Sequence, residues 1–318
     1  MTNAPALIAD IGGTHVRFAL VRPGEEPADT VKMRCADYSG PAEAAMAYLS
    51  AVNPPAKPRR AAFAVASPIG GDRIDLINSP WGFSIEGVRQ ALGLDSFTLV
   101  NDFTAVALSV NHLKPEDLVA LGGGSAMAGA PIAVLGPGTG LGVSGLVPTP
   151  SGQWVALAAE GGHSTMPAFD DREAAIISWL RQRYGHVSVE RLLSGPGMVN
   201  LYEAIAALAK RPAAYTTPDA ISQRGLDRSC PLCHETLETF FAMMGTVAGN
   251  LVLTLGARGG VYIAGGILPR MAEAFAASGF RARFEAKGRF SPYLVPIPAW
   301  LIIHPQPAFA GLAGLVSE

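Results

Sequence analysis

An amide and a carboxylate, Asn101 and Asp102, follow a predicted strand at residues 97–101 and precede a helical pattern. Aspartate is a favoured N-cap residue, because its carboxylate accepts N–H groups of the first helical turn. We therefore expect Asp102 to cap this helix. A carboxylate at the carboxyl end of a strand, facing a cleft, can also accept the proton of a substrate hydroxyl group. The two roles are compatible, so Asp102 is the leading candidate for a catalytic base.

Other acids, amides and an imidazole lie beside glycine or turn residues. Glu160 and His163 are three residues apart around two glycines, Glu190 begins the segment Glu-Arg-Leu-Leu-Ser-Gly-Pro-Gly, and Asn78 lies in Asp-Leu-Ile-Asn-Ser-Pro-Trp. Taken alone, His163 is typical of a hydrogen-bonded loop residue. Glu190 is typical of the first turn of a helix, and Asn78 of a turn. Their functional weight depends on the motifs around them.

Two glycine turns, Asp10–Thr14 and Gly136–Gly140, each connect two apolar segments that we interpret as strands. The segments superpose as strand, Gly-Thr turn and strand when Gly13 is aligned with Gly138, which indicates a duplicated unit. Glycine lets the backbone approach a ligand closely and adopt positive φ, so consecutive N–H groups can point to one anion. Two such turns facing each other across a cleft would hold a polyphosphate.

Two common nucleotide motifs do not account for these glycines. Gly140–Gly145 matches Gly-x-Gly-x-x-Gly, but a dinucleotide fold requires a helix directly afterwards, and residues 143–147 and 153–159 look like strands. A P-loop is excluded because no lysine is followed by Ser or Thr. The backbone of the turns must therefore hold any nucleotide.

The three cysteines do not form a disulfide framework, so we expect a reducing cytoplasm. Cys230, Cys233 and His234 match the haem-attachment pattern Cys-x-x-Cys-His, but we find no export signal in the sequence. As half of a zinc site, they lack a second ligand pair at a usual spacing. The segment is therefore interpreted as the start of a helix.

The composition indicates a folded protein that binds small molecules. Hydrophobic residues make up 49% and charged residues 16%, and the net charge of −2 gives no general attraction to nucleic acid or anionic membranes. Residues 240–257 carry no charge and are long enough for a short membrane helix. Asn250 and several Gly and Thr residues dilute this segment, so we expect a buried core helix and no membrane partner.

The elements that must position these residues alternate between strands and helices. Strands are expected near 6–11, 15–22, 61–66, 97–101, 132–135, 143–147, 153–159 and 259–264. Helices are expected near 41–52, 84–92, 171–184, 188–193, 197–211, 234–257 and 308–316, with another after Pro269. This order predicts an α/β fold with sheets of mixed direction, and a second half that begins near Leu113.

Together these segments resemble bacterial glucokinases, within the hexokinase–actin–Hsp70 ATPase superfamily, over essentially the whole chain. The resemblance rests on Asp10–Thr14, Asn78 with Trp81, Asn101-Asp102, Gly136–Gly142, Glu160–His163, Glu190–Gly197 and Val261–Gly266. It implies a two-lobed, ribonuclease-H-like α/β fold with a central cleft. The small domain would be residues 1–112 plus 303–318, and the large domain residues 113–302.

The resemblance also implies a role for each candidate residue. Asp102 resembles the catalytic base. Asp10 resembles the acid that organises Mg²⁺, through water because this ion keeps much of its hydration shell. The residues that resemble sugar ligands are Asn78, Asn101, Asp102, Glu160, His163 and Glu190. Those that resemble the ATP-binding turns are Gly12, Gly13, Thr14, Gly138 and Thr139 for the phosphates, and Gly265 and Gly266 for adenosine.

The implied activity is that of a cytoplasmic glycolytic enzyme, which converts ATP and glucose into ADP and glucose 6-phosphate. In-line placement and compensation of charge are the main requirements of this reaction. Similar enzymes are commonly homodimers, so we expect one here. The family commonly has asparagine after Gly-Gly-Thr, whereas this chain has His15, which affects the geometry and pH dependence of γ-phosphate binding. The zinc–cysteine cluster of the related ROK sugar kinases is absent, so His163 is expected to bind sugar rather than metal.

Three alternatives remain open at this point. A kinase of this kind can act on another hexose, such as fructose, mannose or an N-acetyl amino sugar. A sugar-sensing regulator would bind without phosphorylating, but such relatives usually add a helix-turn-helix, and there is no room for one before residue 6. An actin-like or Hsp70-like ATPase is disfavoured by the sugar-type acids and by the modest length of 318 residues.

Overall fold

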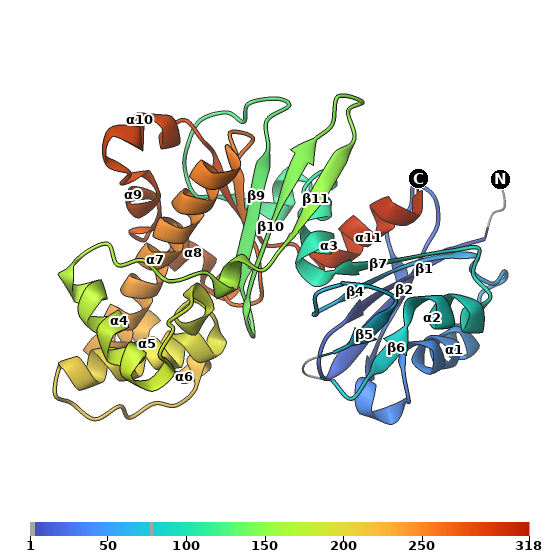
Figure 1. The fold of residues 1–318 in the computed structure, drawn as a ribbon, viewed down its shortest axis with the longest axis horizontal. Coiled ribbons are helices and arrows are strands. Elements are labelled where there is room, and N and C mark those ends of the chain that lie inside the picture. Colours follow the sequence, from blue (N-terminus) through green and yellow to red (C-terminus); the bar gives the residue numbers. More distant parts are fainter. Residues whose placement is uncertain (1–3, 77–78, 318) are drawn as a thin grey trace. The chain divides into compact units, whose positions relative to one another are not determined.

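The computed structural model describes residues 4–76 and 79–317, and it divides into two compact units (Figure 1). Unit 1 combines Met1–Pro115 with His304–Glu318, and unit 2 is Glu116–Ile303. Each unit has its own main sheet and its own buried core.

The centre of unit 1 is a five-stranded sheet in the order β3-β2-β1-β4-β7. Its strands are β1 (Ala6–Ile11), β2 (His15–Val21), β3 (Ala28–Arg34), β4 (Arg60–Val65) and β7 (Ser96–Asn101). β2 runs antiparallel to β1 and β3, whereas β4 is parallel to β1 and to β7. β5 (Arg73–Asp75) and β6 (Gly82–Ser84) form a separate antiparallel pair.

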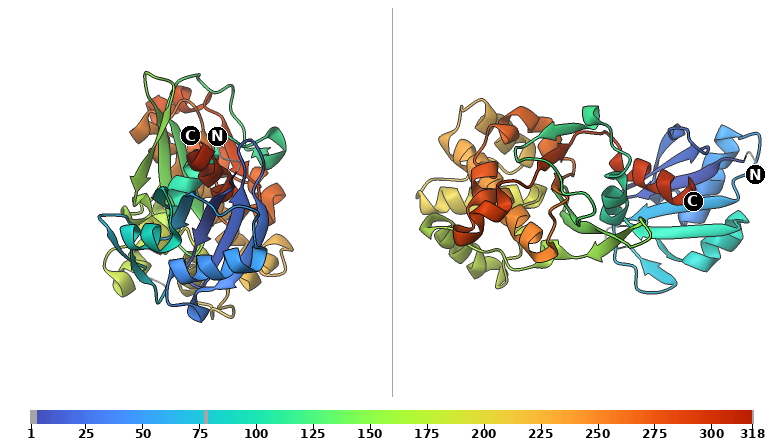
Figure 2. Two further views of the ribbon diagram at one scale, coloured as in Figure 1. Left: turned by 90° about the vertical axis from the view of Figure 1, so that its right-hand side faces the viewer. Right: turned by 90° about the horizontal axis from the view of Figure 1, so that it is seen from above.

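Helices cover both faces of this sheet because alternate apolar residues of β1 point to opposite sides. One face packs with α1 (Pro41–Val52) and α2 (Ile85–Leu92). The other packs with α3 (Asp102–Ser109) and α11 (Pro307–Ser317), the red C-terminal helix in Figures 1 and 2. A side chain at Gly311 would overlap the carbonyl oxygen of Ala105, so the close approach of α11 to α3 requires glycine there.

Unit 2 contains a six-stranded sheet in the order β11-β10-β9-β12-β13-β8. Its strands are β8 (Leu118–Ala120), β9 (Ile132–Pro137), β10 (Leu141–Pro148), β11 (Trp154–Ala159), β12 (Val261–Ile263) and β13 (Ala299–Ile302). β10 is antiparallel to β9 and β11, and β12 is parallel to β9 and β13. The first five strands repeat the order and directions of the unit 1 sheet, so the predicted duplication is confirmed.

The helices of unit 2 surround one long apolar helix. They are α4 (Asp171–Tyr184), α5 (Gly195–Leu208), α6 (Pro218–Leu226), α7 (Pro231–Leu255), α8 (Ala272–Ala276), α9 (Phe280–Glu285) and α10 (Ser291–Leu294). α7 is long and apolar enough to cross a membrane, but 67% of its apolar window is buried within the protein. It packs against α5, α6, α9 and β9, which makes it a core helix as predicted.

Several details of the local structure differ from the sequence-based expectations. Residues 188–193 were expected to be helical, but only Val189–Arg191 form a 3₁₀ turn, because the Ser194 hydroxyl caps α5 immediately afterwards. No sequence signal indicates β3 or α6. β3 is largely exposed and therefore lacks an apolar alternation, and α6 is short and polar on most of its surface.

Candidate functional site

In unit 1, the parallel strands β1, β4 and β7 end at the same edge of the sheet. Ile11 is paired with Val65, and Val65 is paired with Asn101. Since neighbouring strands lie about 4.8 Å apart, the backbones of β1 and β7 end roughly 10 Å from each other. The structure therefore places the first glycine turn (Asp10–Thr14) and the Asn101-Asp102 pair at one edge.

The cap of α3 is Asn101, so the prediction that Asp102 is the N-cap is wrong. Asn101 Oδ1 accepts the N–H groups of Phe103 at 2.9 Å and Thr104 at 3.3 Å. Asp102 has helical geometry at the first position of α3, and its Oδ1 accepts the Phe103 N–H at 2.8 Å. Because Asn101 performs the capping, the Asp102 carboxylate lies within the first turn of α3, near the positive end of the helix dipole.

Asp10 is half-buried near the end of β1 and faces Arg17 across the hairpin. The two residues are paired in the β1–β2 register, and Arg17 Nη1 lies 3.4 Å from Asp10 Oδ2. Burial raises the pKa of Asp10, and the charge and hydrogen bond of Arg17 oppose that rise. Arg17 is thus a site neighbour that the motif analysis missed. The position of Arg17 directly opposite Asp10 in a two-strand hairpin was the signal for it.

Hydrogen bonds within unit 1 close the first glycine turn. Gly12 N–H donates to the His15 carbonyl at 2.9 Å, and Cys35 N–H donates to the Thr14 carbonyl at 2.9 Å. His15 follows the turn and is paired with Arg34 on β3. Burial lowers the pKa of His15, as do the nearby charges of Lys32, Arg34 and Arg17. His15 is therefore a predominantly neutral imidazole at neutral pH.

In unit 2, the second glycine turn (Gly136–Gly140) packs against the turn that follows β12. A Cβ atom at Gly136 would overlap the Ala264 carbonyl, and one at Gly265 would overlap the Pro137 carbonyl. Gly265 also has a φ of +86°, which favours glycine. Gly138, in contrast, has φ outside the left-handed region and has nothing within 4 Å of the position of an added Cβ. Gly138 therefore does not adopt the positive φ that the sequence suggested for the glycine turns.

Glu190 is attached to the second glycine turn. Its Oε2 accepts the Leu141 N–H at 2.8 Å, and a side chain at Gly140 would overlap this carboxylate oxygen. Gly195 N–H, at the start of α5, donates to the Gly138 carbonyl at 2.8 Å. Glu190 and the second glycine turn are separate candidates in the sequence, and the structure brings them into contact.

Glu160 and His163 flank a short 3₁₀ turn, Gly161–His163, beside β10. A Cβ atom at Gly162 would overlap the Leu141 carbonyl, so this turn lies directly against the second glycine turn. Glu160 Oε2 is 4.0 Å from His163 Nε2, and both side chains are more than half exposed, at 55% and 64%. Val189 N–H donates to the Ser164 carbonyl at 2.9 Å, which ties this segment to the one that carries Glu190.

The candidate residues thus form one group in each unit. Unit 1 holds Asp10, Gly12, Gly13, Thr14, Asn101 and Asp102. Unit 2 holds Gly138, Thr139, Glu160, His163, Glu190, Gly265 and Gly266. Asn78 lies outside the described residues.

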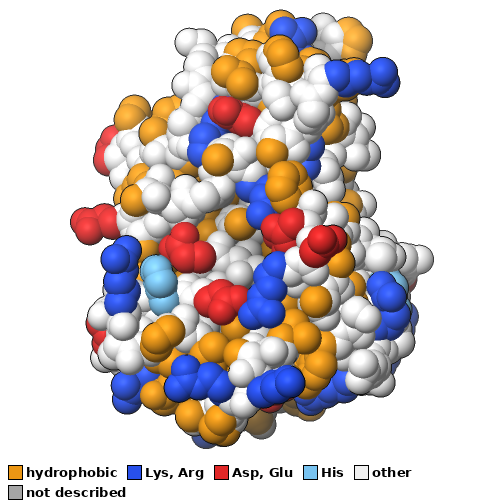
Figure 3. All heavy atoms as spheres, turned by 90° about the vertical axis from the view of Figure 1, so that its left-hand side faces the viewer, with side chains coloured by type: hydrophobic (Ala, Val, Ile, Leu, Met, Phe, Trp, Pro, Cys, Tyr) orange, Lys and Arg blue, Asp and Glu red, His pale blue; other side chains and the backbone are white. Residues whose placement is uncertain are grey.

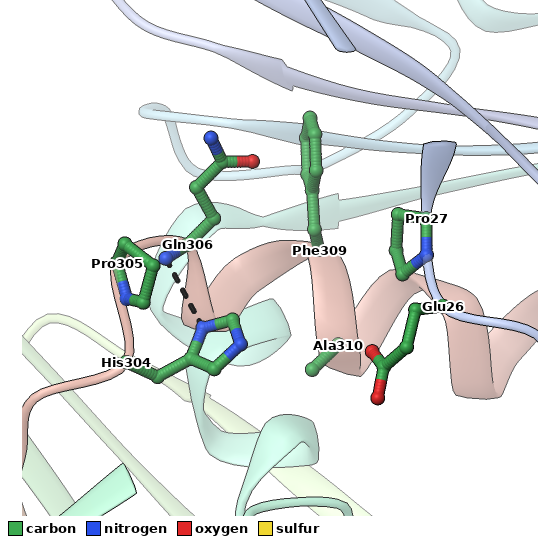
Figure 4. A pocket seen from close by; sticks show the side chains of 7 residues that line it. All are labelled: Glu26, Pro27, His304, Pro305, Gln306, Phe309 and Ala310. Carbon is green, nitrogen blue, oxygen red and sulfur yellow. Dashed lines mark hydrogen bonds between the residues drawn. The ribbon is translucent and has the colours of Figure 1, made fainter. Parts of the chain in front are cut away.

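A small pocket elsewhere in unit 1 contains none of these residues (Figure 4). Its volume is about 150 Å³, and Glu26, Pro27, His304, Pro305, Gln306, Phe309 and Ala310 line it. Gln306 N–H donates to His304 Nδ1 at 3.1 Å. The mainly apolar lining and small volume do not suit a polyol or a nucleotide.

Comparisons with known proteins agree with the resemblance read from the sequence. A protein-family model described as Glucokinase matches residues 7–318. A glucokinase of Paramagnetospirillum magneticum is 64% identical over 312 residues, covering 98% of this chain and 97% of that protein. One of Neisseria meningitidis serogroup C is 50% identical over 314 residues, covering 99% and 95%.

A solved structure supports the same conclusion about the fold. The crystal structure of a glucokinase from an Antarctic psychrotroph matches with a TM-score of 0.90 and 36% identity, covering 100% of both chains. The predicted fold class, a two-lobed ribonuclease-H-like α/β fold, is confirmed by this match and by the mixed sheets of the two units.

Proposed function

Because the chain belongs to the glucokinase family, we propose that it transfers the γ-phosphoryl group of ATP to glucose, giving ADP and glucose 6-phosphate. The observation that carries this proposal is the family match over residues 7–318. The position of Asn101 and Asp102 at the carboxyl edge of the unit 1 sheet, beside Asp10, supports the assignment of the reacting groups.

Asp102 is proposed as the base that accepts the proton of the glucose 6-hydroxyl. The N–H of Phe103 fixes one carboxylate oxygen at 2.8 Å, so the side chain is held in a defined orientation at the start of α3. An oriented, ionised carboxylate is what a proton acceptor requires. The hydroxyl can then attack in line while its proton moves to Asp102.

The sugar would be bound by Asn78, Asn101, Asp102, Glu160, His163 and Glu190. Carboxylates suit this role because each can accept hydrogen bonds from two neighbouring hydroxyl groups. Asn101 uses Oδ1 to cap α3, so its amide NH₂ is the group that would donate to a sugar hydroxyl. Glu190 Oε2 is engaged by Leu141 N–H, which leaves Oε1 to accept from the sugar.

The nucleotide would contact Gly12, Gly13, Thr14, Gly138 and Thr139 through its phosphates, and Gly265 and Gly266 through adenosine. Gly138 gives particular support, since neither packing nor a left-handed φ requires glycine there. Close approach of a ligand to the backbone is a remaining reason for glycine at such a position.

Asp10 fits a magnesium ion held through water. MgATP needs few protein ligands, because the ion keeps several waters and binds the phosphates directly. Among the described residues, no cluster of three His, Cys, Asp or Glu side chains forms a metal cage. The single half-buried carboxylate of Asp10 matches that sparse requirement. When bound, the ion would neutralise charge on the triphosphate.

We also propose a cytoplasmic homodimer that acts on small molecules. The net charge is −2, and acidic and basic side chains are interspersed on the face shown in Figure 3, which supports small substrates rather than nucleic acid. Sedimentation at several protein concentrations tests the dimer.

Replacing Asp102 with Asn tests the proposed mechanism, because this change keeps the side-chain size and an oxygen that can accept the Phe103 N–H. We expect kcat to fall by about 10²–10⁴, the usual contribution of general base catalysis. ADP release is measured with glucose, fructose, mannose and N-acetylglucosamine. A kcat near that of the unmodified protein would refute the base assignment. If kcat/KM is higher for another of these hexoses, that hexose replaces glucose as the proposed substrate.

A further inference from the structure

One sequence motif has no part in the proposed transfer reaction: Cys230-Pro231-Leu232-Cys233, at the start of α7. Cys230 occupies the N-cap position with extended backbone angles, φ −132° and ψ 112°, and it is half-buried. Cys233 lies in the first turn and is fully buried. Both thiols are free.

The two side chains come from the same end of α7, because Cys230 is the N-cap and Cys233 is the third residue of the helix. Each thiol influences the pKa of the other, and the N–H groups of Cys233 and Leu232 favour the ionised Cys230 sulfur. Residues three apart on a helix have Cβ atoms about 5–6 Å apart, and a disulfide requires about 3.5–4.5 Å. Cys230 precedes the helix and has extended backbone angles, so rotation of its backbone can shorten this separation.

The thiols also differ in acidity. Burial works to raise the pKa of Cys230, but the N–H groups of α7, the Cys233 thiol and Arg211 together hold it below the usual value. Burial raises the pKa of Cys233 to about 12, and the Cys230 partner adds to that rise. The pair therefore consists of a partly exposed group that ionises readily and a buried group that holds its proton. Such asymmetry is typical of reactive Cys-x-x-Cys pairs.

We propose that Cys230 and Cys233 form a redox pair that closes reversibly to a disulfide by exchange with a low-molecular-weight disulfide such as oxidised glutathione. The Cys230 thiolate attacks one sulfur of this oxidant and expels one thiolate, which leaves a mixed disulfide on Cys230. Cys233 then loses its proton and attacks the Cys230 sulfur, expelling the second thiolate. Two electrons pass to the oxidant, which leaves as two thiols carrying the protons of Cys230 and Cys233.

Helix α6 connects this pair to the second glycine turn. At its C-terminal end, Cys230 N–H donates to the Arg224 carbonyl at 3.3 Å, and a side chain at Gly225 would lie 2.8 Å from the Cys233 carbonyl. At its N-terminal end, Pro218 lies 3.7 Å from the Cβ position of Gly195, whose N–H binds the Gly138 carbonyl. Closing the disulfide moves Cys230 and thereby α6. This step rests on the proposed function: if the second glycine turn binds the phosphates of ATP, oxidation weakens ATP binding there.

Thiol chemistry is measured first, because it does not depend on the proposed activity. The folded protein is incubated with oxidised and reduced glutathione at defined ratios, alkylated, and mapped by mass spectrometry. We expect a peptide that links Cys230 and Cys233, with Cys35 remaining reduced as an internal control because it is fully buried and its thiol donates to the Gly12 carbonyl. Recovery of both thiols in reduced form at all ratios would overturn the proposal.

Two variants separate the steps. Cys233→Ser should stop after the first step and keep one glutathione on residue 230, whereas Cys230→Ser should take up none at residue 233. Glutathione on Cys233 in the latter variant would contradict the assigned order of attack.

The coupling to α6 is tested with the ATP dependence of the oxidised and reduced forms. We expect the KM for ATP to rise on the order of fivefold on oxidation and to recover with dithiothreitol. In Cys230→Ser the same treatment should leave KM unchanged. A disulfide that forms without a change in KM would refute the coupling. A disulfide in a protein without kinase activity would refute the proposed function and leave the redox pair intact.

Discussion

Gly136 and Gly138 lie two residues apart in the second glycine turn, but replacement by alanine is expected to affect them differently. Gly136→Ala should lower stability, whereas Gly138→Ala should lower the affinity for ATP. Gly136→Ala places a methyl group against the Ala264 carbonyl, which is backbone and cannot rotate away. Overpacking of this kind costs about 1–3 kcal/mol. For a unit of this size, each kcal/mol lowers Tm by about 2–4 °C, so we expect a fall of roughly 2–12 °C.

Gly138→Ala meets nothing within 4 Å and requires no left-handed φ. We therefore expect a stability change within about 0.5 kcal/mol, as at ordinary surface positions. If the turn binds phosphate, the added methyl group prevents one charge-assisted hydrogen bond, which is worth about 1.5–3 kcal/mol. The affinity for ATP should then fall by about 10- to 150-fold.

Thermal unfolding followed by circular dichroism measures the first effect, and calorimetric titration with a non-hydrolysable ATP analogue measures the second. The two variants serve as controls for each other. Gly138→Ala with unchanged nucleotide affinity and unchanged Tm would refute the assignment of this turn to phosphate. A large loss of Tm in Gly138→Ala would show that packing requires glycine at this position, and the effect on ATP affinity could then not be assigned to a phosphate contact.

Three other predictions concern the two units. Asn101→Ala removes the cap of α3 and should cost about 1 kcal/mol in urea unfolding, whereas Asn101→Asp should keep the cap; equal losses would contradict the capping role. Glu173→Gln neutralises the buried partner that lies 2.5 Å from Arg283 and leaves this arginine with the more exposed Asp170 at 3.8 Å, so the loss of one charge-assisted hydrogen bond should cost about 1.5–3 kcal/mol; an unchanged urea midpoint would refute this. Arg17→Gln removes the charge that opposes the raised pKa of Asp10, so this pKa should rise further. Because the proposed role of Asp10 needs its ionised carboxylate, the acid limb of the pH profile of kcat/KM for ATP should move to higher pH. An unchanged acid limb would exclude Asp10 from ATP binding.

The duplicated architecture could be predicted because its determinants are local. Each glycine turn stands between two apolar runs, and such runs specify buried strands wherever both faces of a sheet are covered. The same reasoning found α1, α2, α4 and α7, which have clear caps or long apolar stretches. It failed for β3, since an exposed edge strand such as Ala28–Arg34 has no core face to impose a pattern.

The details of the candidate site were harder to predict for two physical reasons. Asn101 and Asp102 are both good caps, and only the backbone conformation decides which of them precedes the helix and which is its first residue. The contact of Glu190 with Leu141 joins residues 49 positions apart, so no local pattern contains it. Arg17 could have been predicted as a neighbour of Asp10, because the pairing of β1 with β2 places the two residues opposite each other.

The interrupted course of unit 1 has a consequence for synthesis on the ribosome. One face of its sheet rests on Phe309 and Leu312, which are translated after the whole of unit 2. Until those residues emerge, Ala6, Ile8 and Ala62 lack the part of their cover that α11 supplies, even though their strands were made first. The later-made unit can therefore acquire its native packing before the earlier one, and a nascent chain stalled near residue 303 would expose an apolar surface that chaperones recognise.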